Sequence, residues 1–321
     1  MMIYFNVIIG FFLLLGAAEL LVRGAVDLAA RLGIPPLVIG MTIIAFGTSA
    51  PELVISVDAV MNDATGLAIG NIVGSNIANI LLILGVAAIV RPILVKPDIL
   101  LQDALMLMGA SLLFTVFVVM DAIDQTAAVV FLIVLLVFLW TSYQQQSNDV
   151  VDETRAPTAN YPTKKHISIS IILVVAGLIG LVLGAELLVD GGTDIARSFN
   201  VSEEVIGLTL LALGTSLPEL AASVVAARRG HVDVAVGNIV GSNLFNMFAV
   251  GGLSALIVPL PVISQISSFD IWVMLASTAM IMPVLIWGWR MTRIHAVIFL
   301  ILYILYVGAQ AYGVDPLLDG I

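Results

Sequence analysis

The sequence GTSAPE at Gly47–Glu52 occurs a second time as GTSLPE at Gly214–Glu219. Each copy is followed by the block GNIVGSN, at Gly70–Asn76 and at Gly237–Asn243, so one offset of 167 residues superposes both pairs without a gap. The chain is therefore a duplicated unit. Each copy places one glutamate in a strongly apolar stretch, and because an ionisable residue is costly inside a membrane, each glutamate marks a candidate site.

The composition indicates a polytopic membrane protein. Of the 321 residues, 61% are hydrophobic and only 11% are charged, whereas roughly a quarter of a typical soluble domain is charged. The first apolar segment, 3–22, has no basic region before it and no small-residue cleavage site after it, so it is expected to remain as a membrane span. The chain has no cysteine, which excludes disulfides and thiolate chemistry.

The spacing of the apolar segments predicts an all-α fold. About twenty apolar residues cross a bilayer as a helix. On that scale the sequence predicts ten transmembrane helices, at 3–30, 37–62, 66–90, 98–120, 126–143, 167–197, 204–228, 233–258, 269–288 and 294–312. The polar segment 144–166 is predicted to link a first five-helix repeat, 1–143, to a second, 167–321.

The basic residues predict the orientation of the helices. With ten spans, the loops after the first, third, fifth, seventh and ninth helices share one side of the membrane. Nearly all the basic residues lie in these loops, namely Arg31, Arg91, Lys96, Arg155, Lys164, Lys165, Arg228, Arg229, Arg290 and Arg293. By the positive-inside rule this side is cytoplasmic, so we expect the linker 144–166 in the cytoplasm and both termini outside.

The helix count also predicts how the two copies are related. Five helices separate corresponding points of the copies, and because this number is odd, the second copy enters the membrane from the opposite face. Such an inverted repeat is typical of secondary transporters, whose site lies near the midplane where the copies meet. The symmetric polar motifs favour alternating access over a channel, although paired carboxylates also form cation filters.

The GTS-x-PE motif predicts a break in its helix. Pro51 has no N–H, so the carbonyl of Gly47 loses its helical partner and the turn opens. Thr48, Ser49 and Glu52 then lie beside the break. The second copy repeats these residues as Gly214, Thr215, Ser216, Pro218 and Glu219. Unwound backbone at membrane depth is tolerated only where it faces protein or a polar cavity, so both breaks are expected to line a site.

The donors at the two breaks are oxygen atoms, which indicates a hard cation. Carbonyls, hydroxyls and two carboxylates are available, without histidine or cysteine, which argues against a soft metal. Calcium takes six to eight oxygen ligands and tolerates an irregular geometry. The charges of two glutamates would balance one calcium ion, and sodium ions or protons could satisfy the same carboxylates.

The GNIVGSN blocks predict close helix packing beside the breaks. Their glycines, spaced four residues apart, form a small-xxx-small face. Amides and hydroxyls on these helices are then expected to face the broken helices, from Ser75, Asn76 and Asn79 in one copy and Ser242, Asn243 and Asn246 in the other. The serines and asparagines could also serve helix packing.

Together the two motifs resemble the α-repeats of the sodium/calcium exchanger family, within the cation/calcium antiporters. The resemblance covers residues 38–80 and 205–247 and fits a member of prokaryotic type without a large regulatory domain. It implies a sodium/calcium antiporter in the plasma (inner) membrane. The transported ions are then Ca²⁺ and Na⁺, with no covalent cofactor, no nucleic acid and no obligate protein partner.

The resemblance also implies a role for individual residues. Glu52 and Glu219 would be calcium ligands shared with sodium, and the carbonyls of Thr48 and Thr215 would complete the calcium site. Sodium sites on either side would be lined by Ala45, Thr48, Ser49 and Ser75 with Glu52, and by Ala212, Thr215, Ser216 and Ser242 with Glu219, while Asn79 and Asn246 would lie beside the centre.

Several alternatives stay open from the sequence. Some relatives carry an aspartate at the position of Asn246, including the potassium-dependent exchangers, so the amide favours potassium independence. A proton- or potassium-coupled exchanger is the alternative to sodium coupling, and a calcium-permeable channel is a third. An enzyme is not expected, because no catalytic motif accompanies the GTS serines. The repeated acids Glu19/Glu186 and Asp27/Asp194 could pair structurally or line an ion path, so they stay outside the candidate site.

Overall fold

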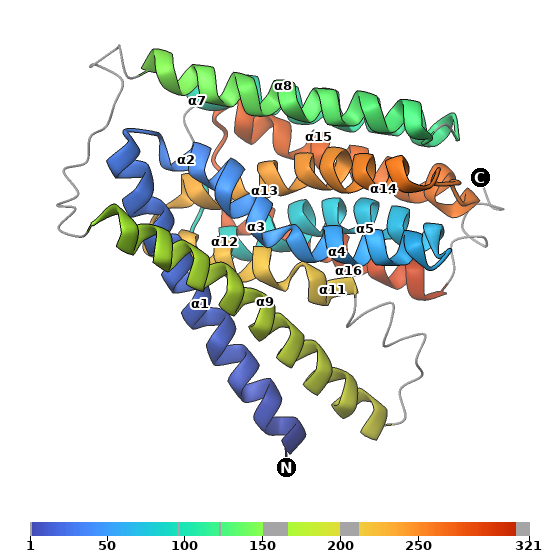
Figure 1. Ribbon diagram of the computed structural model, residues 1–321, viewed down its shortest axis with the longest axis horizontal. Coiled ribbons are helices and arrows are strands. Elements are labelled where there is room, and N and C mark those ends of the chain that lie inside the picture. The colour runs from blue at the N-terminus through green and yellow to red at the C-terminus, as the bar shows by residue number, and fades with distance from the viewer. Residues whose placement is uncertain (1, 95–96, 122, 150–165, 200–211, 313–321) are drawn as a thin grey trace.

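The structure is a computed structural model that describes residues 2–94, 97–121, 123–149, 166–199 and 212–312. Within these ranges the chain is helical, and its only strand-like pairing is an isolated bridge between Ile93 and Met291. Figure 1 shows a bundle of long helices with two further helices, α1 (Met2–Leu32) and α9 (Ile167–Ser198), crossing one of its faces diagonally. The expected all-α class is confirmed.

The helices before the linker begin and end close to their expected positions. The second expected helix is divided into four pieces, and the expected helix 126–143 continues past residue 144, where the linker was expected to start. After α1, the elements are α2 (Pro36–Ile39), η1 (Gly40–Ile44), α3 (Ala45–Thr48), α4 (Ala50–Met61), α5 (Thr65–Ala78), η2 (Asn79–Ile83), α6 (Leu84–Val90), α7 (Pro97–Val119) and α8 (Gln125–Asp149).

The described helices after the linker follow a similar order, with one additional π-helical turn before the long helix that ends at Trp287. The expected helix 204–228 begins in residues outside the described part of the chain, and the structure describes this segment from Ala212 onward. After α9, the elements are α11 (Ala212–Thr215), α12 (Leu217–Arg229), α13 (Val232–Phe245), η4 (Asn246–Val250), α14 (Gly251–Ile257), η5 (Ile266–Asp270), α15 (Ile271–Trp287) and α16 (Arg293–Tyr312).

The described part of the chain contains helices that are long and apolar enough to span a bilayer. Eight described helices meet this criterion, and the bent pair 36–48 and 50–61 brings the number to nine. Their outer faces carry exposed large hydrophobic side chains, for example Ile294, Ile301 and Ile304 on α16. Such a surface is suited to lipid rather than to water, so the chain is an integral membrane protein.

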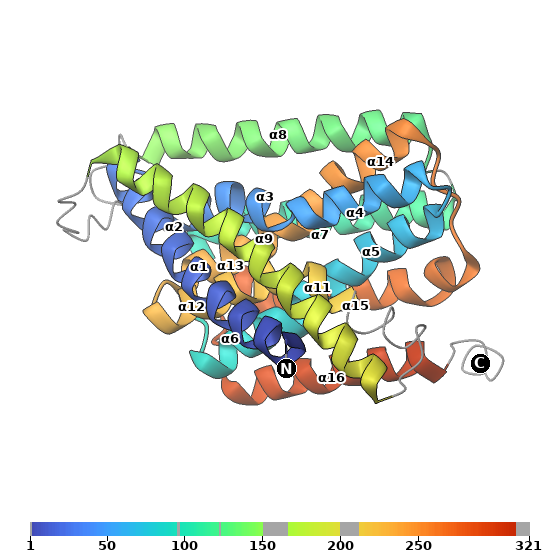
Figure 2. The same ribbon diagram turned by 60° about the horizontal axis from the view of Figure 1, so that its bottom comes forward.

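Helices α1 and α9 form an antiparallel pair. Gly177 lies opposite Leu21 and Gly184 opposite Leu14, so the residue numbers run in opposite directions along the contact. A Cβ atom added at Gly177 would lie 2.6 Å from the backbone nitrogen of Leu21, which leaves no room for a side chain. Figure 2 shows the same pair side by side from a second direction. The small residues therefore permit close backbone approach.

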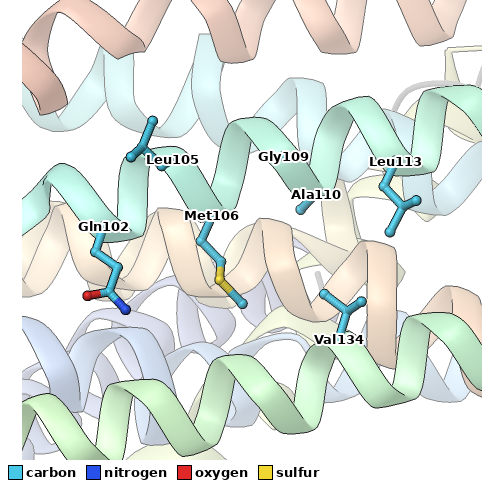
Figure 3. Close-up of a pocket in the computed structure, with 7 residues that line it drawn as sticks. All are labelled: Gln102, Leu105, Met106, Gly109, Ala110, Leu113 and Val134. Carbon is cyan, nitrogen blue, oxygen red and sulfur yellow. The ribbon is translucent and has the colours of Figure 1, made fainter.

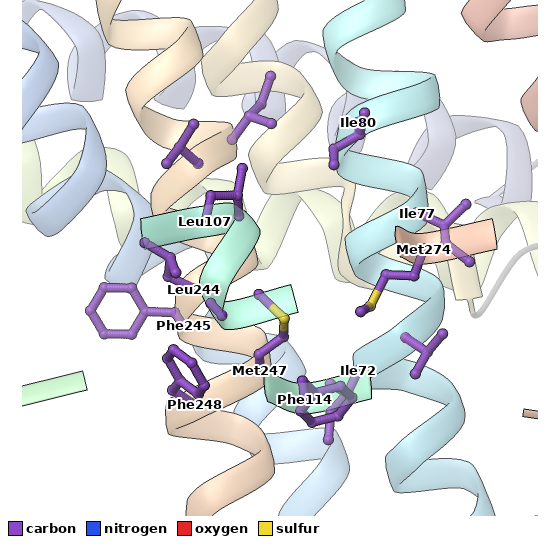
Figure 4. Packing of buried hydrophobic residues seen from close by; sticks show 14 of the residues in the cluster. Ile72, Ile77, Ile80, Leu107, Phe114, Leu244, Phe245, Met247, Phe248 and Met274 are labelled. Carbon is purple, nitrogen blue, oxygen red and sulfur yellow. The ribbon is translucent and has the colours of Figure 1, made fainter. Parts of the chain in front are cut away.

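The apolar core lies between the two halves. Phe131 of α8 contacts Phe114 of α7 and Phe248 of η4, with ring centroids 5.5 Å and 5.6 Å apart. Figure 4 shows Phe114 and Phe248 together with Ile72 and Met274 from α5 and α15. The core thus packs helices that are far apart in sequence against one another, and it supports the polar residues described below.

The loops join in two separate sets. The N–H of Ile93 donates to the carbonyl of Met291 at 3.0 Å, and the N–H of Met291 donates back at 2.9 Å. In the other set, the N–H of Leu260 donates to the carbonyl of Ile123 at 2.9 Å. Each of these contacts joins two loops that the sequence predicted to share a side of the membrane.

Candidate functional site

Both GTS-x-PE motifs break their helix at the serine. Ser49 has φ −84° and ψ 4°, and Ser216 has φ −86° and ψ 3°, so the two breaks share one backbone conformation. Backbone hydrogen bonding resumes with the N–H of Leu53 donating to the carbonyl of Ser49 at 3.2 Å. The helix bends by 40° at the first break. The proline thus interrupts the helix as the sequence predicted.

The two glutamates lie directly after these breaks and are brought together. Glu52 is 1% exposed and Glu219 is 0% exposed. Ser49 Oγ donates to Glu219 Oε1 at 2.9 Å, and Ser216 Oγ approaches Glu52 Oε1 at 3.5 Å. Each carboxylate is therefore held by a serine of the opposite half, and the site is shared between the two copies of the motif.

The two threonines of the motifs are buried beside the glutamates. Thr48 and Ser242 lie close to the Glu219 carboxylate, although the Ser242 hydroxyl is outside hydrogen-bonding geometry. Thr48 Oγ1 instead donates to Asn238 Oδ1 at 3.3 Å. Thr215 is buried as well. These hydroxyls bring neutral oxygen atoms to the carboxylates, as a cation site requires.

The remaining predicted residues occupy the neighbouring turns. Ala45 and Ser75 are buried, and Ala212 is the first residue of α11. Asn79 and Asn246 each begin a π-helical turn, η2 and η4, which are equivalent under the 167-residue offset. Single π turns are frequent at functional sites because they change the direction of side chains.

The asparagines connect the two halves only in part. Asn79 Nδ2 donates to Asn243 Oδ1 at 3.0 Å. Both polar atoms of the Asn246 carboxamide are buried without a hydrogen-bond partner in the described residues, and so is Asn79 Oδ1. Buried polar groups are normally satisfied, so these atoms indicate a place for water or an ion.

The glutamates also have unused oxygen atoms. Glu52 Oε2 and Glu219 Oε2 are buried and accept no hydrogen bond from any described residue. No basic side chain in the described ranges forms an ion pair with either carboxylate. Two buried carboxylates without a positive partner are costly, and a bound cation would offset that cost.

The described residues contain no cluster of three or more His, Cys, Asp or Glu side chains. A cation bound here would therefore be held by two carboxylates and by neutral oxygens. This donor set fits calcium and sodium, which both accept carbonyl and hydroxyl ligands, better than a transition metal.

The structure adds a pair of asparagines that the sequence interpretation did not single out. Asn71 and Asn238 are the second residues of the two GNIVGSN blocks. Their carboxamides donate to the carbonyls of Glu52 and Glu219 at 3.3 Å and 3.4 Å, respectively. The repeat offset alone could have identified them, because both asparagines are duplicated.

Of the repeated acids outside the candidate site, the two in the first half have partners elsewhere. Glu19 of α1 pairs with Arg23 on the same helix and with Arg229 at the end of α12. Asp27 accepts hydrogen bonds from Arg31 Nε at 3.0 Å and from Ser170 of α9. These contacts favour structural pairing over an ion path.

A separate cavity of about 400 Å³ lies along α7 and α8. Figure 3 shows Met106, Gly109 and Ala110 on α7 with Val134 on α8 at its wall. None of the predicted site residues lines it. The two site glutamates are instead buried in the interior.

The chain resembles proteins of one family over nearly its whole length. A family model described as sodium/calcium exchanger protein matches residues 2–144 and 169–312. The chain is 30% identical to the sodium/calcium exchanger MaX1 of Methanosarcina acetivorans, covering 95% of this chain and 97% of that protein. It is 39% identical to the inner membrane protein YrbG of Escherichia coli, covering 78% of this chain and 79% of that protein.

A solved structure has the same fold. It is the sodium-calcium exchanger NCX_Mj soaked with 2.5 mM Na⁺ and 0.1 mM Ca²⁺, and it superposes with a TM-score of 0.81 at 31% identity. The match covers 96% of this chain and 98% of the other. The similarity therefore extends well beyond the two repeated motifs.

Proposed function

The chain belongs to the sodium/calcium exchanger family, and we propose that it exchanges Na⁺ for Ca²⁺ across the membrane by alternating access. The observation that carries the proposal is the pair of buried carboxylates. Glu52 and Glu219 come from different halves, each faces a serine of the opposite half, and each keeps a second oxygen unused by the described residues. Because the two halves share the site, a movement between them would open or close it.

We assign the central ligands to the two glutamates and to the backbone carbonyls of Thr48 and Thr215. A calcium ion would neutralise the two carboxylates, and sodium ions would use the same oxygens, so the two ions compete. The flanking sodium ligands would be Ala45, Ser49, Ser75, Ala212, Ser216 and Ser242, with Asn79 and Asn246 beside the centre. The unpartnered amide atoms at Asn79 and Asn246 support this assignment.

We further propose ten spans arranged as two inverted five-helix repeats, 1–143 and 167–321. The equal backbone angles at Ser49 and Ser216 and the equivalent π turns η2 and η4 support the repeat. Ser111 and Thr278 are equivalent under the 167-residue offset, and their hydroxyls lie 3.4 Å apart. A residue that touches its own repeat mate lies near an axis relating the two halves, as an inverted repeat requires.

The proposed orientation puts the linker in the cytoplasm and both termini outside, in the plasma (inner) membrane. The two sets of loop contacts, Ile93 with Met291 and Leu260 with Ile123, support the division of the loops. Arginines lie near the loops that Ile93 and Met291 join. A Cβ added at Gly230, which follows Arg228 and Arg229 in the sequence, would lie 2.8 Å from Arg91 Nη1. Basic loops favour the cytoplasmic side.

The exchange is proposed to be electrogenic and independent of potassium. If more than two sodium ions enter per calcium ion, each cycle moves net charge, and the voltage contributes about 2.3 kcal/mol per charge per 100 mV. Asn246 adds an amide and no charge at the centre, which leaves two carboxylates to balance the ions. Without a third carboxylate, the site has no evident need for an additional monovalent cation.

The test is calcium uptake into sodium-loaded proteoliposomes that contain the full chain. Uptake should require the outward sodium gradient, should persist without potassium, and should respond to an imposed voltage. Choline-loaded vesicles with a pH gradient provide the comparison. Uptake driven by protons alone would replace sodium with proton coupling, and uptake without any gradient would indicate a channel.

A further inference from the structure

Two asparagines contact the peptides that carry the site glutamates. Asn71 Nδ2 donates to the carbonyl of Glu52 at 3.3 Å and to Ser56 Oγ at 3.0 Å. In the second half, Asn238 Nδ2 donates to the carbonyl of Glu219 at 3.4 Å and to Ser223 Oγ at 3.0 Å. The asparagine, the glutamate and the serine each match their counterpart under the 167-residue offset. The same hydrogen-bonded group, which we call the asparagine clamp, therefore occurs in both halves.

The second clamp also reaches the opposite half. Asn238 Oδ1 accepts a hydrogen bond from Thr48 Oγ1 at 3.3 Å, while its Nδ2 holds the Glu219 peptide. One carboxamide therefore contacts the broken helix of each half. Asn238 and Ser223 are both buried, whereas Asn71 is partly exposed. The clamp around Asn238 is thus better shielded from water than its counterpart.

The position of these asparagines matters because the helix is broken one turn before each glutamate. Each contacted carbonyl belongs to the first peptide that is hydrogen-bonded again after the break, because the N–H of Leu53 donates to the Ser49 carbonyl and that of Leu220 to the Ser216 carbonyl. The asparagine therefore anchors the start of the resumed helix, from which the carboxylate extends. A carboxamide suits this task, since it offers a donor to the carbonyl and an acceptor to a hydroxyl. It also adds no charge to a site whose two carboxylates already set the ion balance.

We propose that Asn71 and Asn238 are positioning residues of the ion site. Each orients the peptide of one glutamate, and Asn238 also fixes Thr48 across the boundary between the halves. The proposal rests on the exchange function proposed above. It makes a quantitative distinction, because among the hydrogen bonds described above Asn238 engages site residues of both halves and Asn71 engages one.

The test is calcium binding by the purified full-length protein, measured by titration calorimetry together with the melting temperature of the ion-free protein. Asn71→Leu removes one clamp, and Asn238→Leu removes the clamp and the bond to Thr48. We expect the calcium dissociation constant to rise about tenfold for Asn71→Leu, which loses one hydrogen bond to a site residue, and about 30- to 100-fold for Asn238→Leu, which loses two such bonds. Thr278→Val, which removes a buried hydroxyl outside the site, is the control and should leave calcium affinity unchanged.

A double-mutant cycle isolates the contact between the halves. Thr48→Val removes the hydroxyl and keeps the backbone carbonyl, and it leaves Asn238 in place should Asn238→Leu fail to fold. In the Thr48→Val background, the additional effect of Asn238→Leu over Asn71→Leu should disappear, because the shared bond is already lost. If Asn71→Leu, Asn238→Leu and Thr48→Val all lowered the melting temperature and left the calcium affinity unchanged, the asparagines would only stabilise helix packing. This result would overturn the proposal.

The same measurements separate this proposal from the exchange function. In one outcome the wild-type protein binds calcium and the calcium dissociation constants of the variants follow the expected order, yet the wild type takes up no calcium against a sodium gradient. This outcome would overturn the exchange function and retain the positioning role. Wild-type protein that exchanges the ions while all three variants bind calcium normally would retain the exchange and overturn the positioning role.

Discussion

Replacing Glu52 with glutamine tests whether the two carboxylates act on a divalent ion together. The substitution keeps the shape and removes one of two negative charges in a site where the described residues provide no basic partner. At roughly 4 Å and an effective dielectric constant of about 20, one unit charge contributes on the order of 4 kcal/mol for a monovalent ion and about twice that for a divalent ion. Calcium binding should therefore weaken far more than sodium binding.

The assay is the melting temperature of the purified protein with calcium, with sodium, and without either ion. Ligand at 100 times its dissociation constant stabilises the folded state by about 2.7 kcal/mol, so calcium should raise the wild-type melting temperature and should not raise that of Glu52→Gln. The ion-free variant should melt higher than ion-free wild type, because one of two repelling buried charges is gone. Glu186→Gln makes the same chemical change at an exposed position of α9 and serves as the control.

Two results would refute this reasoning. If Glu52→Gln kept the full stabilisation by calcium, the carboxylate would not face the ion. If sodium binding weakened more than calcium binding, the charge argument would be wrong even if the residue lay in the site.

Three further predictions concern other parts of the protein. Gly177→Ala should lower the free energy of unfolding by about 1–3 kcal/mol, since its Cβ would lie 2.6 Å from the Leu21 nitrogen. Gly70→Ala should not lower the free energy of unfolding, because a Cβ added there would have nothing within 4 Å. Thermal unfolding of the two variants compares them. Burial lowers the pKa of His231 below 6.5, and two nearby arginines add to this effect while an aspartate opposes it. Because the folded state binds the proton less well than the unfolded state does, protonation favours unfolding. Relative to His231→Gln, wild type should lose stability as the pH falls below 6.5, and the two proteins should be equally stable well above that pH. Asn246→Asp adds a third buried carboxylate, so calcium uptake should become dependent on an added monovalent cation such as K⁺, and potassium-independent uptake by this variant would contradict the role given to the amide.

The positions of the helices could be predicted from the sequence because membrane spans have a fixed length. Apolar segments of about twenty residues are separated by clusters of turn-forming and charged residues. The break beside Pro51 was predictable for a different reason, because the missing N–H of a proline removes a helical hydrogen bond wherever it occurs inside a helix. Local chemistry did not predict where α8 ends, because Gln144 to Asp149 are polar but remain helical.

The contacts between the halves could not be predicted in detail. The sequence singled out both glutamates and serines, but the donation from Ser49 to Glu219 depends on how two distant segments meet. The π turn that begins at Asn79 likewise depends on packing around the asparagine, because the residue itself is compatible with an ordinary helical turn. Asn238 was missed because its block was interpreted by its glycines and by Ser242 and Asn243, and the role of the Asn238 carboxamide emerges only from the folded arrangement.

The most direct test of the shared site is an experimental structure with a calcium-like ion that scatters strongly, such as Sr²⁺. We predict one divalent ion between the carboxylates of Glu52 and Glu219, and its loss when sodium is raised. A divalent ion bound away from either glutamate, or one that sodium at high concentration leaves in place, would contradict the account.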